Sequence, residues 1–477
     1  MAYNHGLHLV FGSGSEARDT VQIWRLAIAR TNTSHRVPPQ ERANIGIIGA
    51  GILGLTLGYR FAKDGHAVTL YERDSSVGGL VRSITLNGLS MDRFYHVILM
   101  SDRNWISLIQ EIGLGERIYF TETKAGFYFN GKTYSMATVS EYLRFPLLSG
   151  ADRFRLALTL QWCKMQKDWH ELEHVSIEKF LISKGGTTLF ERFWKPLLKA
   201  KFDGRYETLP MPYIWSRVRR MASTRRKISQ REVMGHIRGN IQVVVDTLQG
   251  KIHELGGTVF TNTAVDHIVF KNNRITGVVV NGRERNHDVV ISTLPHPQYQ
   301  RLLPEELRDR DSSQVEYMGI VCTLLVMKKR LTHFHTLNLA DETTPYTGII
   351  ETTNVIDPSL MNGRHLVYIP KYVSPQNKRW LSRTDDDITA ECFGNLERMF
   401  PSFNRADVEA VWIGREAFVE PLYTLDFYKN IPPFEGPAPG LYVANNSQTY
   451  PFLLNCESVV SLANSVVSTV YASMPQS

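Results

Sequence analysis

Cysteine is scarce in this sequence, and the few that occur stand far apart. Cys163, Cys322, Cys392 and Cys456 form no CxxC pair, which argues against a zinc site, an iron–sulfur cluster and a disulfide framework. Long apolar runs are also missing, because none reaches the roughly 18 residues that a membrane-spanning helix needs. We therefore expect no metal site and a protein of a reducing compartment, the cytoplasm.

The excess of positive charge is small. The net charge of +7 on 477 residues does not by itself point to nucleic acid. With 43% hydrophobic and 21% charged residues and no low-complexity tract, the composition is that of an ordinary globular protein. The chain is long enough for two or three domains, each with its own core.

The first 42 residues differ in pattern from the rest of the chain. They lack the apolar stretch after a basic start that marks a secretory signal. Several arginines resemble those of an organelle transit peptide, but Glu16 and Asp19 weigh against that interpretation. We expect a loosely attached N-terminal extension that does not shape the fold.

The strongest periodic pattern begins at Asn44. NIGIIGAG is a short buried strand that ends in glycines, ILGLTLGYRFAKDG has helical spacing with Gly65 as its stop, and HAVTLYER is the next strand. Together these segments predict a βαβ unit of roughly 30 residues.

The turn inside this unit has the spacing of a dinucleotide-binding motif. Gly49, Gly51 and Gly54 fit G-x-G-x-x-G, and they permit, in that order, a tight turn, close approach of a pyrophosphate and close helix–strand packing. The helix N-terminus offers N–H groups to the phosphates. Glu72 ends the second strand, where a carboxylate can accept both ribose hydroxyls. The predicted contacts are Gly49, Ala50, Gly51, Ile52, Leu53, Gly54, Glu72 and Arg73.

A second glycine pair bears on the choice between NAD and FAD. Gly78-Gly79 returns toward the first helix, and Leu80 and Arg82 follow. A ligand with two nucleotide halves needs this second contact, whereas a nicotinamide-binding fold usually continues straight into another helix. The spacing therefore favours FAD and adds these four residues to the predicted cofactor contacts.

Beyond residue 105, helical and strand-rich blocks interrupt the nucleotide-binding core. AGFYFNGKTYSM predicts a hairpin with its turn at Asn130-Gly131. We expect an N-terminal extension (1–42), three FAD-binding segments (43–105, 231–300 and 416–477), a helical substrate segment (106–230) and a strand-rich substrate segment (301–415).

Four segments together resemble the flavin-containing amine oxidase superfamily, which includes protoporphyrinogen oxidase, phytoene desaturase-like enzymes and, more distantly, UDP-galactopyranose mutase. They are the glycine turn with its second glycine pair, GGTVFTNTAVDHI, DVVISTLP, and PGLYVANNSQTYPF with the helix after it. The resemblance implies an α/β fold, in which a Rossmann-like, doubly wound FAD-binding domain is interleaved with an α+β substrate-binding domain. It also implies that the backbone of Val265 meets the adenine and that the helix from about Cys456 points its N-terminus at the flavin ring.

The sequence departs from this family at two places. Relatives often have Gly-Gly-Arg where this chain has Leu80, so Arg82 is the candidate partner for the pyrophosphate. Relatives usually have Gly-Asp where Asn445-Asn446 stand. An asparagine can still hydrogen-bond a ribityl hydroxyl, so Asn446 is kept as a cofactor contact.

The segment MDRFYHVIL falls where relatives place a strand and loop beside the flavin ring. Arg93, Tyr95 and His96 are therefore the candidate catalytic residues, with His96 able to shuttle a proton near neutral pH. A packed aromatic segment with one satisfied histidine is the alternative. A lysine lies near the flavin in some amine oxidases, but we do not expect Lys371 to take that place.

The stretch WSRVRRMASTRRKISQRE is the densest in basic residues. It predicts either a solvated helix face with its following loop or a patch for an anionic substrate or an anionic membrane surface. Peripheral membrane contact therefore stays open. No nucleic-acid recognition module accompanies the charges.

We expect an FAD-dependent oxidoreductase that abstracts a hydride from a C–N or C–C bond of a small-molecule substrate. One alternative is a redox-neutral, flavin-dependent sugar-nucleotide mutase. Another is a non-catalytic carrier of the same fold, against which the retained glycines and Glu72 argue. The sequence does not define the substrate, the electron acceptor or the oligomeric state.

Overall fold

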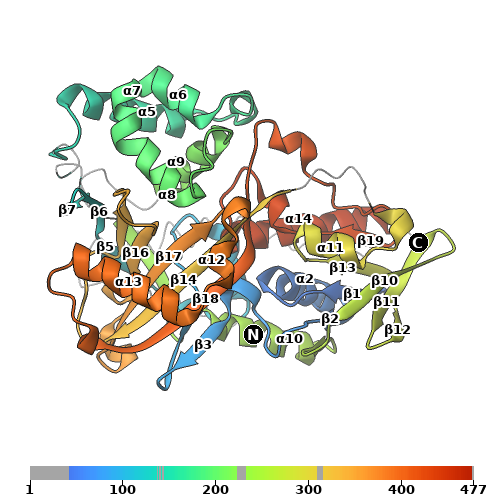
Figure 1. Ribbon diagram of the computed structural model, residues 1–477. Coiled ribbons are helices and arrows are strands. Elements are labelled where there is room, and N and C mark those ends of the chain that lie inside the picture. Colours follow the sequence, from blue (N-terminus) through green and yellow to red (C-terminus); the bar gives the residue numbers. More distant parts are fainter. Residues whose placement is uncertain are drawn as a thin grey trace, which may run out of the picture.

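The computed structural model describes residues 42–136, 138, 141, 144–222, 232–308 and 315–474. The expected extension therefore lies outside the described residues except for Arg42, as do Arg225, Arg226, Lys227 and Arg231 of the basic stretch. Figure 1 shows a parallel sheet with its helices on the right, a second sheet at the lower left and a helical layer above it. Among these residues, no helix combines the length and hydropathy needed to cross a membrane.

The sheet on the right of Figure 1 is entirely parallel, with the strand order β19-β13-β1-β2-β9. Its strands are β1 (Asn44–Ile48), β2 (Ala67–Tyr71), β9 (Thr258–Phe260), β13 (Val289–Ser292) and β19 (Leu441–Val443). Helices α2 (Ile52–Lys63), α3 (Arg103–Glu111), α10 (Gln242–Glu254) and α14 (Cys456–Ser473) pack together beside it. Three distant parts of the chain thus build one nucleotide-binding sheet, which confirms the predicted fold class.

The first βαβ unit has the predicted form. The apolar residues of β1 are buried, as expected for a strand between two parallel neighbours. Helix α2 ends at Lys63, and Gly65 follows with a φ of 95°, a left-handed conformation that favours glycine. Gly65 is therefore the helix stop that the sequence predicts.

A smaller antiparallel sheet extends this half of the molecule at the right edge of Figure 1. It consists of β10 (Val265–Lys271), β11 (Arg274–Val280) and β12 (Arg283–Asn286), and α11 (His296–Leu302) packs against β10. This sheet places Val265 next to the end of β2, because Thr263 N–H donates to the Glu72 carbonyl at 2.7 Å.

The sheet at the lower left has seven strands in the order β18-β14-β17-β16-β15-β6-β7. They are β6 (Ala125–Phe129), β7 (Lys132–Ser135), β14 (Tyr317–Met327), β15 (Thr336–Leu339), β16 (Gly348–Glu351), β17 (His365–Val373) and β18 (Val408–Pro421). All neighbours are antiparallel except β15 and β6. The predicted hairpin at Asn130-Gly131 is confirmed as β6–β7, with a positive φ at both turn residues.

Both faces of the central strand β14 are covered, so all of its residues are buried. Leu325 and Met327 pack with α13 (Asp385–Met399), which follows α12 (Arg379–Ser382). Cys322 and Leu324 pack with the hairpin of β3 (Ser83–Leu86) and β4 (Leu89–Asp92). This two-sided burial explains why the strand is a continuous apolar run instead of an alternating one.

The helical layer forms the top left of Figure 1. It contains α5 (Gly150–Met165), α6 (Ile177–Gly185), α7 (Thr187–Leu189), the π-helix η4 (Phe190–Trp194), α8 (Lys195–Phe202) and α9 (Pro212–Ala222). Their aromatic side chains share one core that reaches β6 and the start of β14. A two-stranded ribbon of β5 (Ile118–Thr123) and β8 (Glu232–Ile237) connects this region to the nucleotide-binding half.

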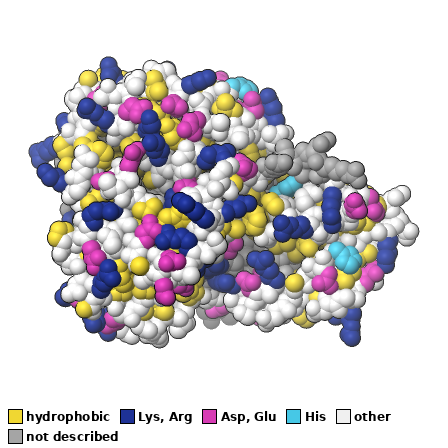
Figure 2. All heavy atoms as spheres, viewed as in Figure 1, with side chains coloured by type: hydrophobic (Ala, Val, Ile, Leu, Met, Phe, Trp, Pro, Cys, Tyr) yellow, Lys and Arg dark blue, Asp and Glu magenta, His cyan; other side chains and the backbone are white. Residues whose placement is uncertain are grey.

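Short 3-10 turns lie in the remaining connections. They are η1 (Gly79–Val81), η2 (Gly115–Arg117), η3 (His170–Leu172), η5 (Glu305–Leu307), η6 (Thr352–Asn354), η7 (Pro358–Met361), η8 (Pro375–Asn377), η9 (Arg405–Asp407), η10 (Phe427–Asn430) and η11 (Asn446–Thr449). The predicted domain boundaries stay a prediction, and the boundary at residue 105 falls within α3. On the face shown in Figure 2, basic and acidic side chains are interspersed.

Candidate active site

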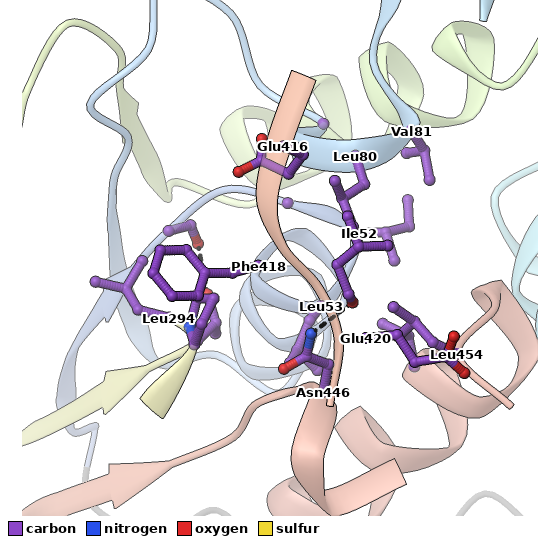
Figure 3. Close-up of a pocket in the computed structure, with 18 of the residues that line it drawn as sticks. Ile52, Leu53, Leu80, Val81, Leu294, Glu416, Phe418, Glu420, Asn446 and Leu454 are labelled. Atoms are coloured by element: carbon purple, nitrogen blue, oxygen red, sulfur yellow. Dashed lines mark hydrogen bonds between the residues drawn. The ribbon is translucent and has the colours of Figure 1, made fainter. Parts of the chain in front are cut away.

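A cavity of about 760 Å³ lies at the junction of the two halves, lined by the β1–α2 turn, the end of β2, β18, α8, α9 and the start of α14. All but three of the predicted site residues line it, the exceptions being Ala50, Gly54 and Arg82. The predicted residues in its wall are Gly49, Gly51, Ile52, Leu53, Glu72, Arg73, Gly78, Gly79, Leu80, Arg93, Tyr95, His96, Val265 and Asn446. Figure 3 shows β18 crossing this cavity with Glu416, Phe418 and Glu420 at alternate positions.

The glycine turn leaves open space where a phosphate would approach. A Cβ added at Gly54 would lie 2.0 Å from the Gly49 carbonyl oxygen, so only glycine allows this contact between helix and strand. A Cβ at Gly51 would meet nothing closer than Gly79 Cα at 4.0 Å. Gly78 N–H donates to the Ala50 carbonyl at 2.8 Å, which confirms that the second glycine pair returns to the first helix.

The Glu72 carboxylate is fixed by two backbone N–H groups at the end of β2. Ala50 N–H donates to Oε2 at 2.9 Å and Asp74 N–H donates to Oε1 at 3.0 Å. A carboxylate has about four acceptor positions, so two remain for ribose hydroxyls. Arg82 instead ion-pairs with Asp74, at 2.6 Å from Nη1 to Oδ2, and lies outside the cavity wall. Its role at the pyrophosphate therefore stays a prediction that its geometry does not favour.

Asn446 lines the cavity and has one side-chain acceptor without a partner. Its Nδ2 donates to the Val419 carbonyl at 2.9 Å, and its Oδ1 is buried with no hydrogen-bond partner in the described structure (Figure 3). A buried polar atom without a partner costs free energy, which a ligand hydroxyl would recover. The contact between Asn446 and the cofactor stays a prediction, and the unpartnered oxygen is compatible with it.

Two helices begin at the cavity. Helix α2 has Gly51 as its N-cap, no side-chain cap and no acidic residue in its first turn, so its N–H groups and positive dipole end are available to phosphates. Helix α14 begins at Cys456, as the sequence predicts, and Leu454 and Asn455 before it also line the cavity. Its N-terminus is therefore near any ring bound beside Leu454.

Arg93 and Tyr95 are held by partners on the seven-stranded sheet. Arg93 Nη2 donates to the Arg415 carbonyl at 2.7 Å, and Nη1 lies 3.5 Å from Glu416 Oε2. The Tyr95 and Tyr372 hydroxyls are 3.1 Å apart. Burial raises the pKa of Tyr95 well above its usual value, so this phenol stays protonated at neutral pH.

His96 lines the cavity but does not titrate where the sequence suggests. Its burial lowers the pKa to about 4, so the imidazole is neutral at pH 7. Its Nδ1 is buried with no hydrogen-bond partner among the described groups. A proton shuttle at His96 near neutral pH therefore stays a prediction that the burial of the imidazole does not favour.

Several residues that the sequence analysis did not select gather beside Tyr95. Lys201 on α8 pairs with Glu420 on β18 at 2.7 Å, and its Nζ lies 3.4 Å from the centre of the Tyr372 ring. Burial alone would lower the pKa of Lys201, but Glu420 outweighs it and the pKa is raised. Tyr213 and Arg217 on α9 complete the group.

The sequence holds a signal for these last residues. Tyr213, Arg217 and Arg220 are spaced by four and three positions, so one face of α9 carries all three. The basic stretch that contains Arg217 and Arg220 predicts either a solvated helix face or an anion-binding patch. Both arginines line the cavity, which favours the second interpretation. Lys371, as expected, lies outside the cavity wall, because its amine pairs with the Asp203 carboxylate.

Comparison with known proteins identifies the family. The sequence profile described as flavin containing amine oxidoreductase matches residues 54–451. The chain belongs to this family. A curated relative, the mitochondrial protoporphyrinogen oxidase of Nicotiana tabacum, is 23% identical over 214 residues, which are 43% of this chain and 41% of that protein. The matches to the first curated relatives thus span less than half of those proteins.

Solved structures agree on the fold. The structure of a putative protoporphyrinogen oxidase from Exiguobacterium sp. 255-15 has a TM-score of 0.73 at 16% identity and covers 91% of this chain and 99% of that chain. A reduced UDP-galactopyranose mutase has a TM-score of 0.68 at 16% identity, covering 91% and 95%. The flavin-containing amine oxidoreductase fold therefore accommodates this chain almost throughout.

The family is flavin-containing, so FAD is the cofactor that membership implies for this chain. The described residues that line the cavity fit FAD. The space over Gly51 and Gly79 is open, two acceptor positions of Glu72 remain, and Asn446 Oδ1 has no other partner. We assign the pyrophosphate to the start of α2, the ribose to Glu72 and a hydroxyl of the flavin side chain to Asn446, as a proposal.

Proposed function

We propose that this oxidoreductase removes a hydride from a C–N or C–C bond of a small molecule bound beside Tyr95. The observation that carries this proposal is one continuous cavity, which joins the nucleotide cradle of Gly51 and Glu72 to the aromatic wall of Tyr95 and Tyr372. FAD, when bound, supplies a hydride acceptor whose two electrons leave to dioxygen or another acceptor.

The residues beside the aromatic wall orient a substrate without acting as a strong base. Tyr95 and Tyr372 stay protonated, because burial raises both pKa values. Lys201 is kept charged by Glu420, and His96 is neutral. A hydride-transfer reaction is compatible with this set, because it requires no protein nucleophile.

The shape of the wall favours a flat or extended substrate. Phe418 projects from β18 into the cavity between Glu416 and Glu420 (Figure 3). Together with Tyr95 and Tyr372 it forms an aromatic surface on which an unsaturated or ring-shaped molecule can pack. The same surface excludes water from the reacting bond.

The test is anaerobic reduction of the FAD-loaded protein by candidate substrates. Amines, unsaturated rings, polyenes and nucleotide sugars are added separately, and the loss of the flavin absorbance near about 450 nm is followed. A substrate of the proposed kind bleaches the flavin and emerges two electrons more oxidised. A flavin that only dithionite bleaches, with a nucleotide sugar isomerised only after that reduction, would replace the proposal with a redox-neutral mutase.

A further inference from the structure

Arg217 is a cation in the cavity without an acidic partner. It lies on α9, is exposed, and lines the cavity together with Tyr213, Tyr95 and Tyr372. No described carboxylate forms an ion pair with it, although Glu420 is near enough to favour its charged form. Its guanidinium therefore has N–H donors free for a ligand.

The neighbouring cations are neutralised, which makes Arg217 distinct. Lys201 pairs with Glu420 at 2.7 Å, and Arg220 pairs with Asp102 at 3.0 Å. On the face shown in Figure 2, basic and acidic side chains are interspersed. Inside the cavity, the positive charge of Arg217 is left in excess on the side of the aromatic wall.

An uncompensated guanidinium in a confined site selects for ligand charge. Charges interact more strongly there than in bulk water, so a protonated amine is repelled and an anion is attracted. A guanidinium also matches carboxylate and phosphate oxygens through paired N–H donors. The Tyr213 hydroxyl, one helical turn before Arg217, accepts a hydrogen bond from the guanidinium and so holds it beside the aromatic wall.

We propose that Arg217 binds a carboxylate or phosphate group of the substrate, so that this amine-oxidoreductase relative takes an anionic, unsaturated molecule and rejects cationic amines. The inference rests on the proposed function for the position of the reacting bond. The binding of the anion by itself is independent of any redox step.

Isothermal titration calorimetry of the FAD-loaded protein tests this inference. The probes are 2-naphthoate for a carboxylate, 2-naphthyl phosphate for a phosphate, and 2-naphthylmethylamine for a cation. The ratio of the two anion affinities then identifies which anion the site prefers. We expect at least one anion to bind at least tenfold more tightly than the amine.

Variants assign the effect to Arg217. Arg217→Met should weaken binding of the preferred anion at least tenfold, and Arg217→Lys should recover part of the loss. The matched control is Arg219→Met on the same helix, because Arg219 stacks on Trp215 and donates to the Gln166 carbonyl outside the cavity wall. This control removes the same charge and should leave the affinity within about twofold of wild type.

Two results would overturn the inference. One is amine binding as tight as that of the preferred anion, and the other is an affinity for that anion that Arg217→Met and Arg219→Met change equally. Neither result bears on flavin reduction, so the proposed function would survive both. Conversely, the anion could bind in an Arg217-dependent manner while no substrate reduces the flavin. That result would support the anion site and contradict the proposed function.

Discussion

The cofactor side and the substrate side of the cavity are built in different ways. On the cofactor side, most contacts come from backbone geometry and one carboxylate within the continuous segment from Gly49 to Gly79, and Val265 and Asn446 add to them. On the substrate side, Tyr95, Arg217 and Glu420 come from segments more than 100 residues apart. A local motif therefore sets what the cofactor meets, whereas tertiary packing sets what the substrate meets.

The glycine turn should separate cofactor binding from folding. Gly51→Val should abolish FAD binding and leave apoprotein stability nearly unchanged, because its Cβ enters open space and the backbone is extended. Gly54→Ala should lower the free energy of unfolding by about 3 kcal/mol, because its Cβ would overlap the Gly49 carbonyl oxygen. Flavin content and chemical denaturation measure both effects. Equal loss of stability in the two variants would contradict this division of roles.

On the substrate side, stability depends on a buried ion pair. Lys201→Met should cost about 3–5 kcal/mol, because it leaves the Glu420 carboxylate buried without its partner. Adding Glu420→Gln to that variant should recover most of the loss. Lys199→Met on the same helix is the control, since its pair with Glu342 is exposed and should cost less than about 1 kcal/mol. Denaturant unfolding gives all four free energies, and similar values for Lys199 and Lys201 would refute the argument.

Buried titratable groups behind the substrate side should make stability depend on pH. Burial lowers the pKa of His236 to about 3 and of His96 and His335 to about 4, so these histidines bind protons in the unfolded chain before they do in the folded one. Their contribution is present above the unfolded pKa of about 6.5 and is lost as pH falls toward 4. Asp92 and Glu351 act in the opposite sense. Burial raises their pKa to about 7, so their contribution to stability is lost as pH rises from about 4 through 7.

The three histidines should make the unfolding free energy fall as pH is lowered from about 6.5 to about 4.5, and Asp92 and Glu351 offset part of that fall. His236→Gln should reduce this dependence by about 1.4 kcal/mol per pH unit, the equivalent of one proton. His333→Gln, at an exposed histidine, should leave it unchanged. Denaturation curves at several pH values decide the matter, and an identical slope for His236→Gln and wild type would show that His236 is not buried in its neutral form.

The smallest effect is expected at Asn446. Asn446→Ala removes the unpaired Oδ1 and should weaken FAD binding about tenfold, the value of one net hydrogen bond of about 1.4 kcal/mol. Asn338→Ala on β15 also removes an amide but lies outside the cavity wall, so it should not change the affinity. Fluorescence titration of the apoproteins with FAD compares the two. An unchanged affinity for Asn446→Ala would exclude the assigned contact.

The sequence predicts most of the cofactor side because its signals are local. The spacing of Gly49, Gly51 and Gly54, the acid at Glu72 and the returning pair Gly78-Gly79 all act within one supersecondary unit. The fold class follows from that unit together with the family resemblance. Arg82 shows the limit of inference from local sequence. We expect it at the pyrophosphate, but its side chain forms an ion pair with the neighbouring Asp74 carboxylate.

The substrate side could not be predicted to the same extent, because its chemistry depends on which distant side chains meet. Lys201 is one of three lysines in α8, and only the tertiary structure pairs it with Glu420 on β18. The segment with Tyr95 and His96 lines the cavity, but the burial that lowers the pKa of His96 has no sequence signature. Arg217 belongs to the basic stretch that predicts either a solvated helix face or an anion-binding patch. Only the three-dimensional structure shows that Arg217 lines the cavity.

The most direct test of the central claim is an absorbance spectrum of the purified protein before and after anaerobic addition of dithionite. We predict flavin bands near about 375 and 450 nm that bleach on reduction and are missing from Gly51→Val. A wild-type spectrum without these bands, unchanged after incubation with FAD, would contradict the assignment of the cavity to this cofactor.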